Sequence, residues 1–292
     1  MQARLIEYFF RFLALFSLPV IHKIGSVIGT IAYSLPNSLK RPLRTNIGLC
    51  FPDLSKQERD HLCKNSFIEM TKTLTESGAL FTWDSQRLLK LVRLISGEEY
   101  LQQAFNKGKG VILALPHLGC WEMMSVYCPS HYPFTALYRP LRLTGLDPFV
   151  KSARERFGSN LVPTNASGIR SLYKALNSNE MVAILPDQDP GREGSLFVPF
   201  FGIPASTMTL VPRLIEKTGA ALVYGYAERL ADGQGYHIHF LPESRDLTRM
   251  SLKDATNTMN QGVERCVRQI PEQYQWAYKR FKTRPKGEPK IY

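Results

Sequence analysis

The pattern of hydrophobic positions along the chain changes near Gly108. Before it, Ser55 and Glu58 form a capping box that opens a long helix to about Leu80, and residues 85–95 predict another helix. After it, short apolar runs typical of buried strands alternate with helical segments. We predict strands at residues 111–115, 134–138, 181–185, 220–227 and 236–241, and helices near residues 148–157, 168–178, 207–217 and 251–270. This alternation favours an α/β layered domain.

The run from Val111 to Leu115 is continuously apolar, as expected of a strand buried on both faces of a parallel sheet. Pro116 ends this strand because proline has no N–H for strand pairing. Residues 120–127 are apolar enough to begin a helix that packs back on the sheet. His117 is therefore predicted to lie in a turn, and Glu122 in the first two turns of the following helix.

The spacing of His117 and Glu122 suggests general base chemistry. On one continuous helix the two side chains would point about 140° apart, but a histidine in the preceding turn can be faced by the glutamate. The carboxylate would then fix the imidazole tautomer while the ring takes a proton from an attacking hydroxyl. Backbone amides of residues 118–120 would stabilise the resulting oxyanion. A purely structural His–Glu hydrogen bond is the alternative.

The first 39 residues decide whether the chain contacts a membrane. Residues 5–21 are rich in Leu, Phe and Ile, but Arg11 interrupts them and Pro19 breaks or kinks them. Residues 24–39 are uncharged. Neither run reaches the ~20 residues of a simple spanning helix. We expect membrane attachment, either as an uncleaved anchor or as an in-plane amphipathic helix, with a hydrophobic hairpin packed on the domain as the alternative.

The net charge of +12, from 37 basic and 25 acidic residues, indicates a partner of negative charge. Nucleic acid, an anionic membrane and phosphorylated substrates all qualify. Basic residues Lys40, Arg41 and Arg44 follow the apolar N-terminal segment and would lie at anionic headgroups. The aromatic and basic residues of 274–290 describe an interfacial belt as well as a nucleic-acid surface. Because of the apolar segment, we expect a membrane and no nucleic acid.

The cysteine pattern argues for a reducing compartment. Five cysteines without C-x-x-C spacing favour neither a disulfide framework nor a zinc site; they are Cys50, Cys63, Cys120, Cys128 and Cys266. Cys120 alone lies beside His117 in sequence, where a nucleophile is conceivable. Its position between Gly119 and Trp121 favours a small packing residue.

Three arginines lie near the predicted carboxyl ends of strands, where α/β folds gather ligands. Arg139 ends one strand, and Arg154 and Arg156 lie on a helix whose start is marked by Asp147 as N-cap and Pro148. Guanidinium groups bind phosphate in bidentate fashion, although each alone is more often part of a surface salt bridge.

A polar loop follows the predicted strand at residues 181–185 and contains Asp187, Gln188 and Asp189. Its paired carboxylates are compatible with glycosidase chemistry. The neighbouring prolines and glycine describe an acidic surface loop equally well.

Several motifs together resemble the bacterial lipid A late acyltransferases, the lauroyl- and myristoyltransferases of the wider glycerolipid acyltransferase fold group. They occur in the family's order over nearly the whole chain: P-H-L-G-C-W-E (116–122), Y-R-P (138–140), A-R-E-R-F-G (153–158), L-P-D-Q-D (185–189), V-P-F-F-G (198–202) and W-A-Y-K-R-F-K (276–282). Pro116 and Cys120 stand where the family commonly has Asn, and Tyr278 and Lys279 replace His and Arg. The predicted His/Glu dyad is intact.

The resemblance implies an αβα layered acyltransferase fold with a mixed, mostly parallel sheet and an N-terminal hydrophobic membrane-attachment helix. Residues 1–39 would form the membrane segment and residues 40–292 the acyltransferase domain. The dyad would transfer a fatty acyl chain from acyl-acyl carrier protein to a hydroxyl of a lipid A precursor, without cofactor or metal, at the cytoplasmic face of the inner membrane. Substrate contacts are expected from Arg154 first and Arg139 second, and from Tyr138, Arg156, Asp187 and Gln188.

Three alternatives follow from the same residues. An acyltransferase of this fold with another acceptor, such as a lysophospholipid, aminolipid or glycolipid, would share every motif. A hydrolase would use Cys120 as nucleophile. A non-catalytic membrane- or nucleic-acid-binding protein would not need Glu122.

Overall fold

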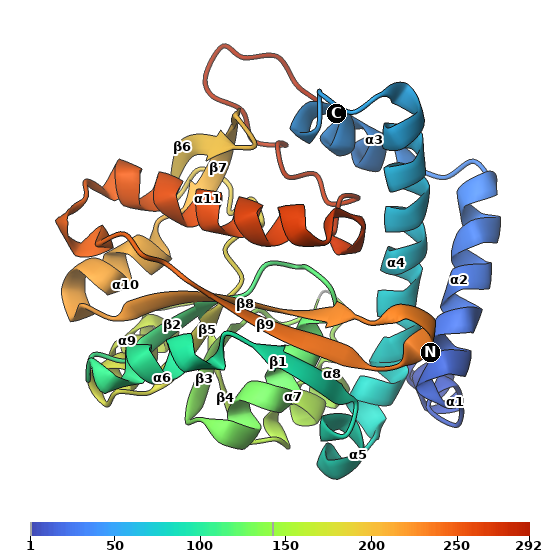
Figure 1. The fold of residues 1–292 in the computed structure, drawn as a ribbon, viewed down its shortest axis with the longest axis horizontal. Helices are drawn as coiled ribbons and strands as arrows, with labels where there is room; N and C mark the ends of the chain where they lie inside the picture. Colours follow the sequence, from blue (N-terminus) through green and yellow to red (C-terminus); the bar gives the residue numbers. More distant parts are fainter. Residues whose placement is uncertain (1, 142) are drawn as a thin grey trace.

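Strands appear in two separate sheets of the computed structural model, which describes residues 2–141 and 143–292. They are β1 (Val92–Ser96), β2 (Val111–Ala114), β3 (Phe134–Tyr138), β4 (Ser159–Pro163), β5 (Met181–Ile184), β6 (Ser195–Phe200), β7 (Ile203–Met208), β8 (Ala221–Arg229) and β9 (Tyr236–Pro242). Within the described residues, seven of these strands form one sheet in the order β1-β9-β8-β2-β5-β3-β4 (Figure 1). Neighbours in this described sheet are parallel except β8 and β9, and β6–β7 is a separate antiparallel hairpin. The predicted mixed, mostly parallel sheet is confirmed.

Helices cover both faces of the large sheet. They are α1 (Gln2–Leu13), α2 (Leu18–Ser34), α3 (Lys40–Cys50), α4 (Lys56–Thr82), α5 (Ser85–Leu89), α6 (Glu98–Asn106), α7 (Trp121–His131), α8 (Asp147–Glu155), α9 (Ala166–Asn177), α10 (Leu210–Thr218) and α11 (Leu252–Gln269). Buried side chains of α9, α10 and α11 pack on one face, and those of α6, α7 and α8 on the other. This is the predicted αβα arrangement.

The apolar strand β2 contributes side chains to the hydrophobic core on each face of the sheet. Successive side chains of a strand point to opposite faces of the sheet. Ile112 and Ala114 accordingly pack with the α11 side, whereas Val111 and Leu113 pack with the α7 side. A strand buried on both faces has no polar position, which explains its uninterrupted apolar run.

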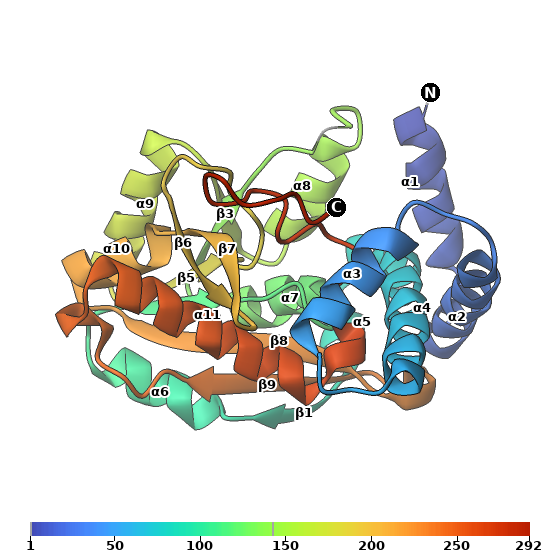
Figure 2. The ribbon, with the colours of Figure 1, turned by 90° about the horizontal axis from the view of Figure 1, so that it is seen from above.

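The N-terminal helices α1 and α2 pack on α4 (Figures 1 and 2), and α4 lies at the end of β8, where Arg229 pairs with Glu76. Gly25 and Gly29 of α2 permit this close approach, because a Cβ at Gly25 would lie 2.6 Å from Thr75 Oγ1 and 2.9 Å from Lys72 Cα. The carbonyl of Gly25 also accepts a 2.8 Å hydrogen bond from Thr71 Oγ1. These glycines, which interrupt the apolar run in the sequence, are therefore the crossing point of two helices.

The outward faces of α1 and α2 remain apolar and exposed. The exposed large apolar side chains of α1, α2 and the turn between them are Leu5, Tyr8, Phe9, Phe12, Leu15, Val20, Val27, Ile28 and Ile31. None of the helices within residues 2–141 and 143–292 combines the length and the apolar character needed to cross a bilayer. The inner faces of α1 and α2 pack on α4, as the alternative of a packed hairpin predicts, and membrane attachment stays a prediction.

One local prediction requires correction. The capping box at Ser55 and Glu58 is confirmed and begins α4, but the helix predicted over residues 85–95 ends at Leu89. Strand β1 follows it at the edge of the sheet and exposes both Leu94 and Ile95. An exposed edge strand lacks the alternation of apolar and polar residues that identifies a strand from sequence.

Candidate active site

The turn that carries His117 follows the carboxyl end of β2, as predicted. Gly119 has a positive φ of 59°, and a Cβ there would collide with the carbonyl oxygen of Ala227 in β8. Glycine is therefore required where this turn meets the neighbouring strand. The Cys120 N–H donates to the same Ala227 oxygen at 2.8 Å, and the Gln275 N–H donates to the His117 carbonyl at 3.2 Å. The turn is thus held from two sides.

His117 is oriented by Asp187. Its backbone N–H donates to Asp187 Oδ2 at 2.8 Å, and its ring Nδ1 lies 2.8 Å from Asp187 Oδ1. Burial alone would raise the pKa of Asp187, but the charge and hydrogen bonds of His117 hold that pKa below its ordinary value. An ionised carboxylate only accepts hydrogen bonds, so Nδ1 carries the proton. When the ring is neutral, its lone pair is therefore on Nε2.

The Nε2 side of His117 faces Gln188 and keeps a path to solvent. Gln188 Nε2 lies 3.1 Å from His117 Nε2 and 3.4 Å from Gln275 Oε1. The His117 side chain is 15% exposed, and the Trp121 ring meets it edge-on at 5.2 Å between centroids. Asp187 and Gln188, which the resemblance implies as substrate contacts, therefore both lie beside His117.

Glu122 has a different partner from the one expected. Arg154 Nε donates to Glu122 Oε2 at 2.9 Å, and Arg154 Nη2 forms a second, shorter bond to Oε1. Within residues 2–141 and 143–292, no hydrogen bond or ion pair joins Glu122 to His117. Both carboxylate oxygens point to Arg154, so the expected direct orientation of His117 by Glu122 is replaced by orientation through Asp187. A catalytic role of Glu122 stays a prediction.

The predicted oxyanion amides are also engaged. Leu118 N donates to the Pro116 carbonyl at 2.7 Å, Gly119 N to the Gln273 carbonyl at 3.0 Å, and Cys120 N to Ala227. The prediction that this turn forms an oxyanion hole is therefore wrong for this conformation. The side-chain amide of Gln188, in contrast, lies beside His117 Nε2.

Of the other predicted substrate contacts, Arg154 and Tyr138 lie together, whereas Arg139 is exposed to solvent. Arg154 lies 5.6 Å from the centre of the Tyr138 ring, so both residues belong to the Glu122 side of the site. The Tyr138 hydroxyl donates to Asp147 Oδ1 at 2.5 Å; Asp147 is the first residue of α8 and not its N-cap. Arg139 is exposed at the end of β3.

Arg156 has a structural role. Its guanidinium donates to the carbonyl oxygens of Leu80, Phe81 and Trp83 at 2.7–2.8 Å. These carbonyls belong to the end of α4, where helices have no internal donors left. The expected phosphate contact by Arg156 is therefore replaced by a cap on α4.

The loop that carries Asp187 is held by the C-terminal segment. The Asp189 carboxylate accepts from the backbone N–H groups of Gly191 at 2.7 Å and of Thr283 at 2.9 Å. The Asp189 N–H donates to the Tyr278 hydroxyl at 2.9 Å. Tyr278, which departs from the family's usual residue, therefore positions the loop beside His117.

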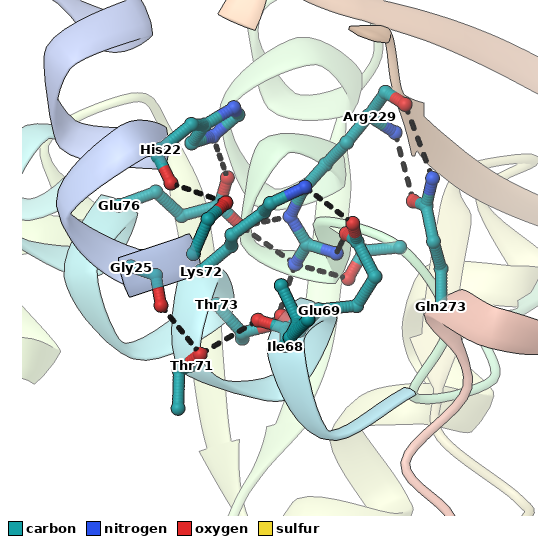
Figure 3. Close-up of polar contacts among 12 residues, drawn as sticks. His22, Gly25, Ile68, Glu69, Thr71, Lys72, Thr73, Glu76, Arg229 and Gln273 are labelled. Carbon is teal, nitrogen blue, oxygen red and sulfur yellow. Dashed lines mark hydrogen bonds and ion pairs between the residues drawn. The ribbon is translucent and has the colours of Figure 1, made fainter. Parts of the chain in front are cut away.

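A buried ionic network supports the other side of the turn (Figure 3). Arg229, which ends β8, donates to the Gly119 carbonyl at 2.8 Å and pairs with Glu76 of α4 at 2.7 Å. Glu76 also lies 2.9 Å from His22 Nε2 and accepts from the Tyr236 hydroxyl at 3.0 Å. Sequence analysis missed this network. Its signals were a glutamate within a long helix and a histidine within an apolar N-terminal stretch.

Cys120 is a packing residue. Its side chain is 1% exposed, and burial raises the pKa of its thiol well above the ordinary value. A buried neutral thiol is a poor nucleophile, which argues against the hydrolase alternative.

Comparison with known proteins identifies relatives over almost the whole chain. The sequence model of the bacterial lipid A biosynthesis acyltransferases matches residues 3–283. The lipid A biosynthesis lauroyltransferase of Escherichia coli (strain K12) is 32% identical over 278 residues, covering 94% of this chain and 89% of the relative. The palmitoleoyltransferase of the same strain is 31% identical with the same coverages. A lipid A biosynthesis acyltransferase of Haemophilus influenzae is 29% identical, covering 94% and 88%.

Proposed function

Because this chain belongs to the bacterial lipid A biosynthesis acyltransferases, we propose that it adds a secondary acyl chain to a lipid A precursor, with His117 as general base. The observation that carries this proposal is the His117–Asp187 pair, with Nδ1 held at 2.8 Å and Nε2 directed toward Gln188. A neutral imidazole fixed in this tautomer suits proton abstraction from an alcohol.

The proposed reaction joins an acceptor hydroxyl to the acyl carbon of a thioester. His117 Nε2 takes the hydroxyl proton as the oxygen attacks the carbonyl carbon, and Asp187 stabilises the imidazolium. The C–S bond then breaks, and the proton passes to the departing sulfur to give a free thiol. We assign the Gln188 amide as the donor to the tetrahedral oxyanion, because it lies beside Nε2 and can turn from the ring to the substrate.

The donor in this proposal is acyl-acyl carrier protein. That carrier is acidic, so the net charge of +12 favours its approach. Arg139 is exposed at the end of β3 and is the proposed contact for a phosphate of the donor or of the lipid headgroup. Arg154 keeps its bonds to Glu122 in this proposal, and we place the substrate against this ion pair.

We propose that the protein docks on the inner membrane, at its cytoplasmic face, through the apolar outer faces of α1 and α2. Phe12 is 55% exposed and Leu15 is 79% exposed, which is unfavourable in water and favourable at a lipid interface. Sedimentation with anionic vesicles tests this directly. Phe12→Ser with Leu15→Ser should reduce binding, whereas unchanged binding would reject docking through this face.

A reconstituted assay tests the acyltransferase proposal. Purified protein is mixed with acyl-acyl carrier protein and a lipid A precursor, and mass spectrometry should show a product heavier by one acyl chain. His117→Ala should abolish that product, whereas His61→Ala, which removes an exposed histidine of α4 bonded to Asn65, should not. Parallel reactions with a lysophospholipid and a glycolipid test the acceptor. Transfer to one of these alone would reject the lipid A assignment but keep the mechanism.

A further inference from the structure

Two histidines and a glutamate form a cluster on the β8–β9 pair that the proposed reaction does not use. His237 and His239 lie on the same face of β9, because they are two residues apart, and Glu228 of β8 is paired in register with His237. The nitrogen and carboxylate atoms that these three side chains offer all lie within 4.8 Å of one another. They belong to the chemical types that bind transition metals.

The distances suit a small tetrahedral ion. Glu228 Oε2 lies 2.9 Å from His239 Nε2 and 4.0 Å from His237 Nδ1. Bonds of about 2.0–2.2 Å from zinc to nitrogen and oxygen place tetrahedral ligand atoms roughly 3.4 Å apart. The observed separations lie on both sides of that value, so small side-chain rotations would complete three ligand positions.

Neighbouring residues fix both imidazole rings. Ser96 Oγ of β1 lies 2.8 Å from His237 Nε2. When this hydroxyl accepts from Nε2, the His237 lone pair is on Nδ1 and faces the cluster. The Tyr226 ring stacks on His239 with centroids 4.6 Å apart and planes 16° from parallel. Such outer contacts are what orient histidine ligands in metal sites.

The cluster is sheltered but accessible. The side chains of His237, His239 and Glu228 are 20%, 19% and 29% exposed. An ion can therefore reach them from solvent, and a water molecule can complete the coordination at the open side.

We propose that Glu228, His237 and His239 bind one divalent transition-metal ion, with Zn²⁺ as the preferred ion because imidazole and carboxylate ligands suit it. The ion would join β8 to β9, and through Ser96 would also fix β1 at the sheet edge. It takes no part in the proposed acyl transfer. Its effect is to stabilise the folded protein, since a ligand that binds only the folded state shifts the unfolding equilibrium.

Metal titration of the untagged full-length protein tests this proposal. Competition with a chromophoric chelator should show one tightly bound Zn²⁺ per chain, and Co²⁺ should give the absorption spectrum of a low-coordinate site with nitrogen ligands. His237→Ala and His239→Ala should each weaken Zn²⁺ binding by about 100-fold or more. Ser96→Ala, which removes only the outer partner, should weaken it by about 10- to 100-fold.

His61→Ala is the matched control, because it removes an exposed imidazole of α4 that is bonded to Asn65 and does not belong to the cluster, and it should leave Zn²⁺ affinity unchanged. Zn²⁺ should also raise the thermal midpoint of the wild type but not of the His239 variant. If His237→Ala fails to fold by circular dichroism, His237→Gln and Ser96→Ala carry the same comparison. Absence of stoichiometric binding in the wild type, or equal affinity in the His239 variant, overturns the proposal.

Discussion

The His117–Asp187 pair and the His22–Glu76 pair have nearly the same nitrogen–oxygen distance but different surroundings. The nitrogen–oxygen distances are 2.8 Å and 2.9 Å. The His117 side chain is 15% exposed and its Nε2 faces the neutral amide of Gln188. In the second pair the histidine side chain is 5% exposed and the carboxylate 0%.

The carboxylates differ in what else they bind. Asp187 receives both the ring and the backbone N–H of His117, so its charge acts on that residue. Glu76 must also balance Arg229, with which it forms a 2.7 Å ion pair, and it accepts from Tyr236. The first arrangement leaves His117 partly exposed, with its second ring nitrogen, Nε2, beside Gln188. In the second pair, the histidine and the carboxylate serve to join α2, α4 and β8.

The largest expected effect is on activity, and it distinguishes the two histidines. His117→Ala should lower the rate of acyl transfer by about 10²- to 10⁴-fold, because the general base is lost, while the protein stays folded. His22→Ala should lower stability and leave the rate per folded molecule within a few-fold. The measurement is the initial rate of acyl transfer from acyl-acyl carrier protein. Each rate is divided by the amount of folded protein, which circular dichroism measures. A comparable rate loss in both variants would contradict the assignment.

The next effect separates the two carboxylates near the site. Asp187→Asn should reduce the maximal rate by about 100-fold or more, since the amide can donate to Nδ1 and favour the wrong imidazole tautomer. Glu122→Gln frees Arg154 and should mainly weaken substrate binding, with a higher KM. Steady-state kinetics on both variants provide the test. A collapse of the maximal rate in Glu122→Gln alone would restore the direct His117–Glu122 dyad.

The sequence predicts the turn that carries His117 but not which carboxylate contacts its ring. A continuous apolar strand, Pro116 and a bulky helix lie within a dozen residues, so short-range rules suffice. Asp187 lies 70 residues from His117, and no local rule ranks it above a glutamate five residues away. The motif resemblance identified the loop that contains Asp187, but only the fold shows which carboxylate contacts the ring.

Long-range contacts also explain the other differences. Arg156 looks the same in sequence whether it binds phosphate or caps α4, because the carbonyls that it contacts are more than 70 residues away. His22 and Glu76 are separated by 54 residues. Their pairing depends on the crossing of α2 and α4 at Gly25, which no local pattern in the sequence predicts.

The third effect concerns stability and isolates the structural pair. Glu76→Gln should lower the free energy of unfolding by about 3 kcal/mol, because the buried Arg229 loses its nearer carboxylate and keeps only the carboxylate of Glu69, 3.5 Å away. Urea unfolding in detergent at neutral pH measures this difference. Glu7→Gln, in a surface pair with Arg11, is the control and should cost less than about 1 kcal/mol. Equal small losses would show that the Glu76 network contributes little to stability.

The smallest expected effect is on the difference in free energy of unfolding between the wild type and Glu76→Gln, which should depend on pH. Burial alone would raise the pKa of Glu76, but Arg229 and His22 lower it to about 2, whereas an unfolded glutamate has a pKa of about 4.3. A folded pKa below the unfolded one stabilises the protein above the unfolded pKa, and this contribution is lost as the pH falls towards the folded value.

The wild type should therefore lose stability faster than Glu76→Gln between about pH 5 and pH 3. A protonated glutamate resembles glutamine, so the gap between the two proteins in free energy of unfolding should narrow over this range. The lowered pKa of Asp187 destabilises both proteins in acid and cancels in the comparison. Urea unfolding at pH 5, 4 and 3 gives the two slopes. Parallel slopes would mean that Glu76 gains no charge stabilisation from Arg229, and the contrast with Asp187 would then rest on exposure alone.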